Sequence, residues 1–303
     1  MERIFLPVRV IVFCCALLFP WPCHCQGNSA SIGVGDAILL GSVQGLAEFY
    51  PISSSIHVRL ADNLLARCRG ATVQTKNYGH FFSVATQLAS LLPALFFFHN
   101  RIGRMFLGLL GRSRSGAHLL CCLCLAVLPC IPVGFFFDRL GWQRAVGWRF
   151  AGYALLFGGI YLFVVEKICA KKQSHPKKLE DLGPIQALAI GLLQCAAFAP
   201  GVSRSLMVLT GGLICGLSTV AAVEFCFLVG CATTLAATAH ALLFSSAGGN
   251  EFFGPVVAGC LAAFACGWLG LFLLLRWLRH GSLRPFACYR MALGMALLIA
   301  SGA

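Results

Sequence analysis

Charged side chains are scarce in this sequence. Only 11% of its 303 residues are Asp, Glu, Lys or Arg, whereas about a quarter is usual in a soluble domain. Hydrophobic residues make up 59% of the chain, and the mean hydropathy is +0.84. This balance excludes an ordinary soluble protein and indicates an integral membrane protein, whose length suits one compact bundle.

The sequence also lacks the alternation of polar and apolar residues that barrel strands show. Its apolar runs are instead continuous over about 20 residues, which is the length of a transmembrane helix. A chain in lipid must satisfy its backbone hydrogen bonds internally, so helices are the remaining solution. The sequence therefore predicts an all-α membrane protein.

Acidic residues are particularly few. The chain has 10 Asp and Glu against 23 Lys and Arg, a formal net charge of +13. The basic residues cluster between apolar runs, as cytoplasmic loops require, and no basic face interleaved with aromatic residues is present. We therefore expect the lipid bilayer as a partner and no nucleic acid. Paired CxxC motifs are also lacking, and most of the 17 cysteines lie in apolar runs as small hydrophobic side chains.

Residues 1–30 differ from the remainder of the chain. Arg3 and Arg9 precede a short apolar run, and prolines and polar residues follow it. This order is typical of a signal peptide, and an uncleaved membrane anchor is the alternative. Residues 31–302 are then expected to form a single membrane-embedded domain.

Two polar segments interrupt the apolar pattern, 150 residues apart. The first covers 36–65 and is broken at Pro51, and the second covers 183–217 and is broken at Pro200 and Gly201. Helices this short predict two re-entrant pairs, which are tolerated at membrane depth where they are buried in protein or line a cavity. Five residues repeat at this offset: Gly41 and Gly191, Gln44 and Gln194, Ala47 and Ala197, Ser53 and Ser203, and Ser55 and Ser205.

Three spanning helices are expected after each broken pair. They are predicted at 79–98, 117–137 and 148–166 in the first repeat, about 31–168, and at 220–245, 254–275 and 286–302 in the second, about 182–302. Since three is odd, the second repeat begins on the opposite side of the membrane, which predicts an inverted repeat. Loops 99–116, 167–181 and 276–290 hold 13 Lys and Arg against 6 in the alternate loops, which places the first set in the cytoplasm.

The residues that do not repeat carry the chemistry. Glu48 is an acidic residue inside an apolar stretch, three serines and His57 follow it, and Arg204 lies just after the second break. Charged groups in hydrocarbon are costly and persist mainly where they function. Helix N-termini attract anions, and the arginine fork suits phosphate. Together they predict a site for a multiply charged anion. Serines and the two glutamines can also serve as interhelical hydrogen-bond partners, and Glu224 is interpreted as an edge charge or a supporting partner.

The motifs resemble a known family. Glu48-Phe-Tyr-Pro51-Ile-Ser-Ser54-Ser-Ile-His57 and Pro200-Gly-Val-Ser203-Arg204-Ser205, with Thr210, are similar to the signatures of the undecaprenyl-diphosphatase (bacitracin-resistance) family. Further similarity lies in the closing segment Pro285-Phe-Ala-Cys-Tyr289-Arg290, and the resemblance covers about residues 31–302. It implies hydrolysis of undecaprenyl diphosphate to undecaprenyl phosphate and inorganic phosphate, recycling of the lipid carrier for peptidoglycan synthesis, bacitracin resistance, and a requirement for Mg²⁺ or Ca²⁺.

The same resemblance implies a role for each matching residue. Glu48 is expected to bind the cation and to act in acid–base chemistry, Ser54 to be the nucleophile, His57 to be a general acid or base, and Arg204 to bind the diphosphate. The expected substrate-binding residues are Gln44, Ser53, Ser55, Gly201, Ser203, Ser205 and Thr210. Gln44 stands where many members carry Glu, and Ile56 and Leu206 stand where Gly is usual.

Several alternatives stay open at this point. His57, oriented by Glu48, either deprotonates Ser54 for attack or activates water directly. A polyprenyl-phosphate flippase or a small-anion transporter is the competing function, because transporters also use inverted repeats with broken helices. The protein is expected in the bacterial inner membrane with its active site on the periplasmic side, and a homodimer is neither predicted nor excluded.

Overall fold

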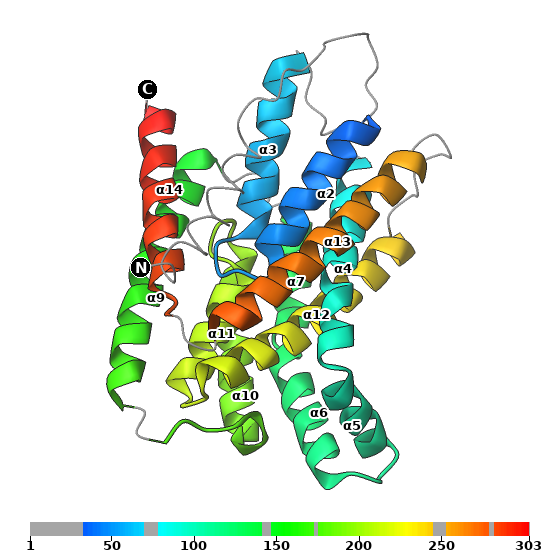
Figure 1. Ribbon diagram of the computed structural model, residues 1–303, viewed down its shortest axis with the longest axis vertical. Coiled ribbons are helices and arrows are strands. Elements are labelled where there is room, and N and C mark those ends of the chain that lie inside the picture. The colour runs from blue at the N-terminus through cyan, green and yellow to red at the C-terminus, as the bar shows by residue number, and fades with distance from the viewer. Residues whose placement is uncertain are drawn as a thin grey trace. The chain divides into compact units, whose positions relative to one another are not determined.

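The computed structural model is helical throughout the part of the chain that it describes (Figure 1). The described residues are 33–69, 78–140, 147–172, 175–244, 253–278 and 282–302. They contain no β-strand, and the only bridge among them joins Lys177 and Leu217. The expected all-α class is therefore confirmed for these residues, whereas the signal-like segment 1–30 lies outside them.

The first broken pair consists of α2 (Val34–Glu48) and α3 (Ser54–Arg69). The Gly33 amide donates to Asp36 Oδ2 at 3.2 Å, which is the half of a capping box that the third helical residue supplies at the start of α2. Pro51 has no amide hydrogen and disfavours helical geometry in the residue before it, so α2 ends as predicted. The chain then passes through Ser53, whose φ of 73° is rare for a residue other than glycine.

The second broken pair repeats this design. It consists of α10 (Pro184–Gln194), the short η2 (Cys195–Phe198) and α11 (Arg204–Ile214). The Gly183 amide donates to Gln186 Oε1 at 3.0 Å, which is the same half of a capping box. Ser203, which precedes α11, has a φ of 78°. The predicted positions of both breaks are confirmed, and the two turns share the same unusual backbone geometry.

The long apolar helices lie where the sequence predicts membrane spans. Among the described residues, five helices are long and apolar enough to cross a membrane: α6 (Arg114–Val127) continued by α7 (Cys130–Arg139), α9 (Trp148–Lys172), α12 (Thr219–Phe244), α13 (Phe253–Leu278) and α14 (Arg284–Gly302). A sixth is obtained if α4 (Tyr78–Phe97) and α5 (His99–Leu109) form one broken span. This supports a multi-pass membrane protein.

Helix α5 corrects the sequence analysis, which placed 99–116 in a loop. The two helices that meet near Phe98 are bent by 84°. Arg101 and Arg104 are three residues apart and lie on one face of α5, while Phe106 and Leu109 are exposed apolar residues. The segment is thus an amphipathic helix. Its arginines are typical of a cytoplasmic loop, which is why the sequence analysis placed it in one.

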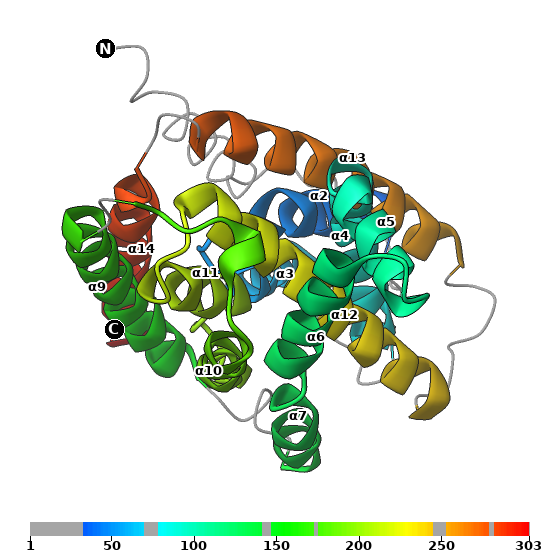
Figure 2. The ribbon, with the colours of Figure 1, turned by 90° about the horizontal axis from the view of Figure 1, so that it is seen from below.

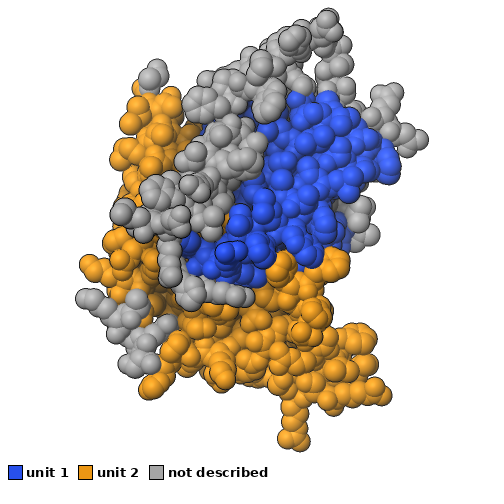
Figure 3. All heavy atoms as spheres, viewed as in Figure 1, with its two compact units in different colours: residues 1–49, 54–93, 234–277 blue, residues 50–53, 94–233, 278–303 orange. Residues whose placement is uncertain are grey.

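The chain divides into two compact units, which are coloured separately in Figure 3. Unit 1 contains α2, α3, α4 as far as Pro93, the end of α12 from Thr234, and α13. Its helices α2 and α13 touch through their backbones. A Cβ on Gly41 would lie 2.1 Å from the Gly259 carbonyl oxygen, and one on Gly45 would lie 2.3 Å from that of Ala263. Small residues therefore let α2 pack directly on α13.

Unit 2 contains the turn 50–53 and the remaining described helices. Helices α9 and α14 run side by side (Figure 2). Helix α10 packs on α6, where a Cβ on Gly191 would lie 2.4 Å from the Ala126 carbonyl oxygen. Gly41 and Gly191 are equivalent in the repeat, so each allows its helix to approach the second predicted span of the other repeat.

Candidate active site

Glu48 ends α2 as a buried carboxylate, with 7% of its surface exposed. Its Oε2 accepts a hydrogen bond from Gln44 Nε2 at 2.6 Å and another from Ser54 Oγ at 2.7 Å. Gln44 is one helical turn before Glu48, and Ser54 is the first residue of α3. The first break therefore brings an amide, a carboxylate and a hydroxyl into direct contact, and all three belong to residues that the sequence analysis selected for the site.

The contact between Ser54 and Glu48 changes the expected roles. The sequence analysis left two roles open for His57, as the base for Ser54 or as the base for water, and the structure shows the Ser54 hydroxyl donating to the Glu48 carboxylate. His57 is almost fully buried, with 1% exposed, and follows Ser54 by three residues, which places both on one face of α3. The Glu48 carboxylate is thus the acceptor of the Ser54 proton, and His57 lies on the same face of α3 one turn further along.

The serines on either side of Ser54 differ in environment. Ser53 is buried and holds the left-handed turn, whereas Ser55 is exposed. Ile56 is fully buried, and so is Leu206 at the equivalent position of the second pair. The bulk added where the family usually has Gly is therefore accommodated in the protein interior.

At the second break, the hydroxyls of Ser203 and Ser205 form a chain of hydrogen bonds from the start of α11 to Tyr50. Ser203 Oγ accepts from the Leu206 amide at 3.4 Å and caps the helix. Ser205 Oγ donates to the Tyr50 carbonyl at 3.3 Å and lies 3.0 Å from Ser203 Oγ. Since a serine has one proton to donate, Ser203 is the donor between the two hydroxyls. These serines therefore connect α11 to the first break turn within unit 2.

Arg204 and Thr210 both lie in α11, the first at its start and the second near its middle. Arg204 opens α11, and its Nη1 donates to Thr233 Oγ1 at 2.9 Å and to the Gly230 carbonyl at 3.5 Å. The guanidinium is thus oriented by α12. Thr210 is fully buried, and its hydroxyl donates to the Leu206 carbonyl at 2.7 Å, one turn back in its own helix.

Arg290 was missed by the sequence analysis, which counted it in loop 276–290. It lies inside α14 with 0% of its surface exposed. Its Nη1 donates to the Pro51 carbonyl at 3.0 Å, and its Nη2 donates to the carbonyls of Ala154, Gly201 and Val202 at 3.2, 2.9 and 3.2 Å. One side chain therefore binds both break turns, and the sequence signal for it was an arginine within the closing motif.

A divalent cation would find oxygen ligands at the first break. Glu48 supplies a carboxylate and Ser54 a hydroxyl that touches it. Mg²⁺ is commonly held by one or two carboxylates together with substrate phosphates. Among the described residues, no three His, Cys, Asp or Glu side chains form a metal site. The donors therefore fit a cation that is shared with a phosphate substrate.

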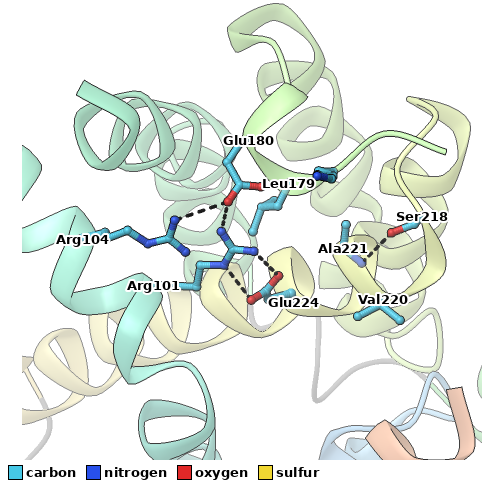
Figure 4. Close-up of a pocket in the computed structure, with 9 residues that line it drawn as sticks. Arg101, Arg104, Leu179, Glu180, Ser218, Val220, Ala221 and Glu224 are labelled. Carbon is cyan, nitrogen blue, oxygen red and sulfur yellow. Dashed lines mark hydrogen bonds and ion pairs between the residues drawn. The ribbon is translucent and has the colours of Figure 1, made fainter. Parts of the chain in front are cut away.

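A second charged cluster in unit 2 lines a cavity of about 610 Å³ (Figure 4). Arg101 donates from Nε to Glu224 at 2.8 Å and is also hydrogen-bonded to Glu180, which Arg104 approaches to 3.5 Å. Burial alone raises the pKa of the Glu180 carboxyl, but the hydrogen bond from Arg101 and the charges of Arg101 and Arg104 outweigh burial and hold this pKa below its ordinary value. Glu224 is therefore an ion-pair partner, and this cluster joins α5 to η1 (Leu179–Asp181) and α12.

The family model and the similar proteins that follow all indicate the same family. The family model described as "Bacitracin resistance protein BacA" matches residues 37–296. An "Undecaprenyl-diphosphatase" of Sorangium cellulosum (strain So ce56) is 34% identical over 268 residues, which cover 87% of this chain and 85% of that protein. One of Neisseria gonorrhoeae (strain ATCC 700825 / FA 1090) is 30% identical over 268 residues, covering 87% and 93%. "Undecaprenyl-diphosphatase 2" of Streptomyces avermitilis is 30% identical over 285 residues, covering 88% and 95%.

Proposed function

This chain belongs to the bacitracin resistance protein BacA family, and we propose that it hydrolyses undecaprenyl diphosphate to undecaprenyl phosphate and inorganic phosphate. Relatives at 30–34% identity that carry the name undecaprenyl-diphosphatase support this reaction. Recycling the lipid carrier in this way sustains cell-wall synthesis and opposes bacitracin, as the family name states.

The observation that carries a mechanism is the hydrogen bond from Ser54 to Glu48. A serine hydroxyl is a weak nucleophile until a neighbouring base takes its proton. At 2.7 Å the carboxylate is within proton-transfer distance of Ser54 Oγ. Ser54 also begins α3, where the helix amides attract a phosphate.

We assign the steps as follows. Ser54 Oγ attacks the terminal phosphorus, its proton passes to Glu48, and the anhydride bond breaks to release undecaprenyl phosphate. His57 protonates the leaving oxygen. Water then attacks the phosphoserine and gives its proton to His57, the bond between phosphorus and Ser54 Oγ breaks to release inorganic phosphate, and Glu48 returns the proton to Ser54. The alternative is direct attack by water, with Glu48 as the base.

Charge on the phosphates must be balanced during these steps. Arg204, Ser203 and Ser205 supply donors for the phosphate oxygens, and preorganised donors of this kind are a large part of catalysis. Gln44, Ser53, Ser55 and the turn at Gly201 are assigned to substrate binding. A Mg²⁺ or Ca²⁺ held by Glu48 would supply further neutralisation of phosphate charge.

We also propose that the two broken pairs belong to inverted repeats in the bacterial inner membrane, with the active site on the periplasmic side. The shared capping hydrogen bonds, the positive-φ serines and the excess of basic residues in alternate loops support this arrangement. An alkaline phosphatase reporter, which folds only in the periplasm, should be inactive when fused after Gly111 and active after Gly147. The reverse result would contradict the orientation.

The function is tested with purified protein in detergent, where no second compartment exists. Wild type should release inorganic phosphate from undecaprenyl diphosphate, a chelator should stop it, and Glu48→Ala should be inactive. A flippase or transporter would release none. Trapping phosphate on Ser54 supports the covalent route, whereas Ser54→Ala with near-normal turnover would establish direct attack by water.

A further inference from the structure

We propose that Arg290 is a positioning residue for this reaction, because its single guanidinium holds the backbone of both break turns. This inference rests on the proposed phosphatase function. Arg290 touches neither Glu48 nor Ser54 in any hydrogen bond of the described residues, and its acceptors are the carbonyls of the two turns and of α9.

The placement of Arg290 is costly and so calls for a function. Arginine keeps its charge in proteins, and a charge inside a membrane helix is expensive unless it is paired. Within the described part of the chain, all four hydrogen bonds of the Arg290 guanidinium go to neutral carbonyls, and its Nε has no partner. If Arg290 only joined the two turns, neutral side chains could do so with a smaller desolvation penalty.

Three of the four carbonyls that Arg290 binds lie just before the two serines with left-handed backbones. Pro51 lies two residues before Ser53, and Gly201 and Val202 lie directly before Ser203. Both serines have left-handed backbones, which persist only where the surroundings hold them. Hydrogen bonds from the rigid guanidinium of Arg290 therefore hold the backbone of both turns. Through the turns they also fix the positions at which α3 and α11 begin.

Helix α9 provides the space for the guanidinium. A Cβ added to Gly158 would lie 2.3 Å from Arg290 Nη2 and 3.0 Å from Cζ. The same helix contributes the Ala154 carbonyl as an acceptor. Gly158→Ala is thus a way to displace the fork without changing its charge.

Displacing the Arg290 guanidinium should also displace Ser54, the proposed nucleophile. Ser54 is joined to Ser53 by one peptide bond, and Ser205 reaches the Tyr50 carbonyl from the other turn. A shift of about 1 Å in a reacting group can cost about 100-fold in rate. Turnover should therefore depend on Arg290 more strongly than substrate binding does.

The experiment measures kcat and KM for phosphate release, together with the thermal midpoint and the helix content. Arg290→Lys keeps the charge and loses the fork, so kcat should fall roughly tenfold or more while KM stays within about threefold. Gly158→Ala should show the same pattern to a smaller degree. The matched control is Gly152→Ala, also on α9 against α14, where a Cβ meets Leu298 at 2.9 Å but not Arg290. Its kcat per folded molecule should match wild type.

Each other result has a defined meaning. If Arg290→Lys and Gly158→Ala both keep wild-type kcat, or lose activity only in proportion to the folded fraction, the positioning role is overturned. A rise in KM with unchanged kcat overturns it as well. If Arg290→Lys does not fold, Gly158→Ala against Gly152→Ala decides alone. A wild-type protein that releases no phosphate refutes the proposed function itself, and the variants are then uninformative about it.

Discussion

At the first break an acidic residue ends the helix before the turn, whereas 150 residues later phenylalanine holds the equivalent position. Glu48 corresponds to Phe198, and Ser54 corresponds to Arg204. The backbones nevertheless agree, since both pairs begin with a capped glycine amide and pass through a left-handed serine. The repeat has therefore kept its framework while its side chains have diverged.

The difference is clearest at the repeated glutamines. Both are buried, yet Gln44 donates to the Glu48 carboxylate at 2.6 Å, and Gln194 donates to the Cys130 sulfur at 2.7 Å. The same residue thus supports a charged group at one break and packs against a thiol at the other. This contrast agrees with the proposal that the first break carries the proton chemistry and that Arg204 at the second break binds the anion.

The strongest test of this contrast is Glu48→Gln, which removes the charge and keeps the shape. We expect kcat for phosphate release to fall about 1,000-fold, because a general base contributes about 10²–10⁴. Phe198→Leu, at the equivalent position, should stay within about twofold. Comparable losses in the two variants would show that the breaks are not chemically different.

Arg204→Lys tests the second break. Lysine keeps the charge but lacks the fork that binds phosphate at two points, so kcat/KM should fall about 100-fold with unaltered folding. Arg114→Lys, an exposed arginine at the start of α6, is the control. Full activity in Arg204→Lys would rule out an anion-binding fork at this position.

The glutamines give a smaller, paired comparison. Gln44→Leu removes a donor to a charged carboxylate, a bond of about 1.5–3 kcal/mol, so turnover should fall roughly 10- to 100-fold. Gln194→Leu removes a donor to a thiol and should change turnover little. If both variants lose the same activity, the glutamines are shared framework and nothing more.

The smallest effect is expected away from both breaks. Because the folded pKa of Glu180 lies below its ordinary value, its contribution to stability is present above the unfolded pKa and is lost as pH falls through the folded pKa. Glu180→Gln should lower the thermal midpoint at pH 7 by about 1–3 °C and leave turnover unchanged. The gap from wild type should close in acid.

The sequence could predict what depends on local pattern. Long apolar runs located the spans, and Pro51 and Pro200 located the breaks. Gln44, Glu48 and Ser54 were selected through the family motif, and their contact follows from helical spacing and one short turn. Helix α5 was missed because the arginines of 99–116 led the sequence analysis to place this segment in a loop. Arg290 was misplaced because its acceptors lie at 51, 154, 201 and 202, and no periodicity relates residues so far apart.

Arg290 is 239 residues beyond Pro51 and lies in α14, the last of the described helices. Because α14 follows the other described helices in the chain, it leaves the ribosome after them. The first break turn therefore gains its contact with Arg290 only late in synthesis.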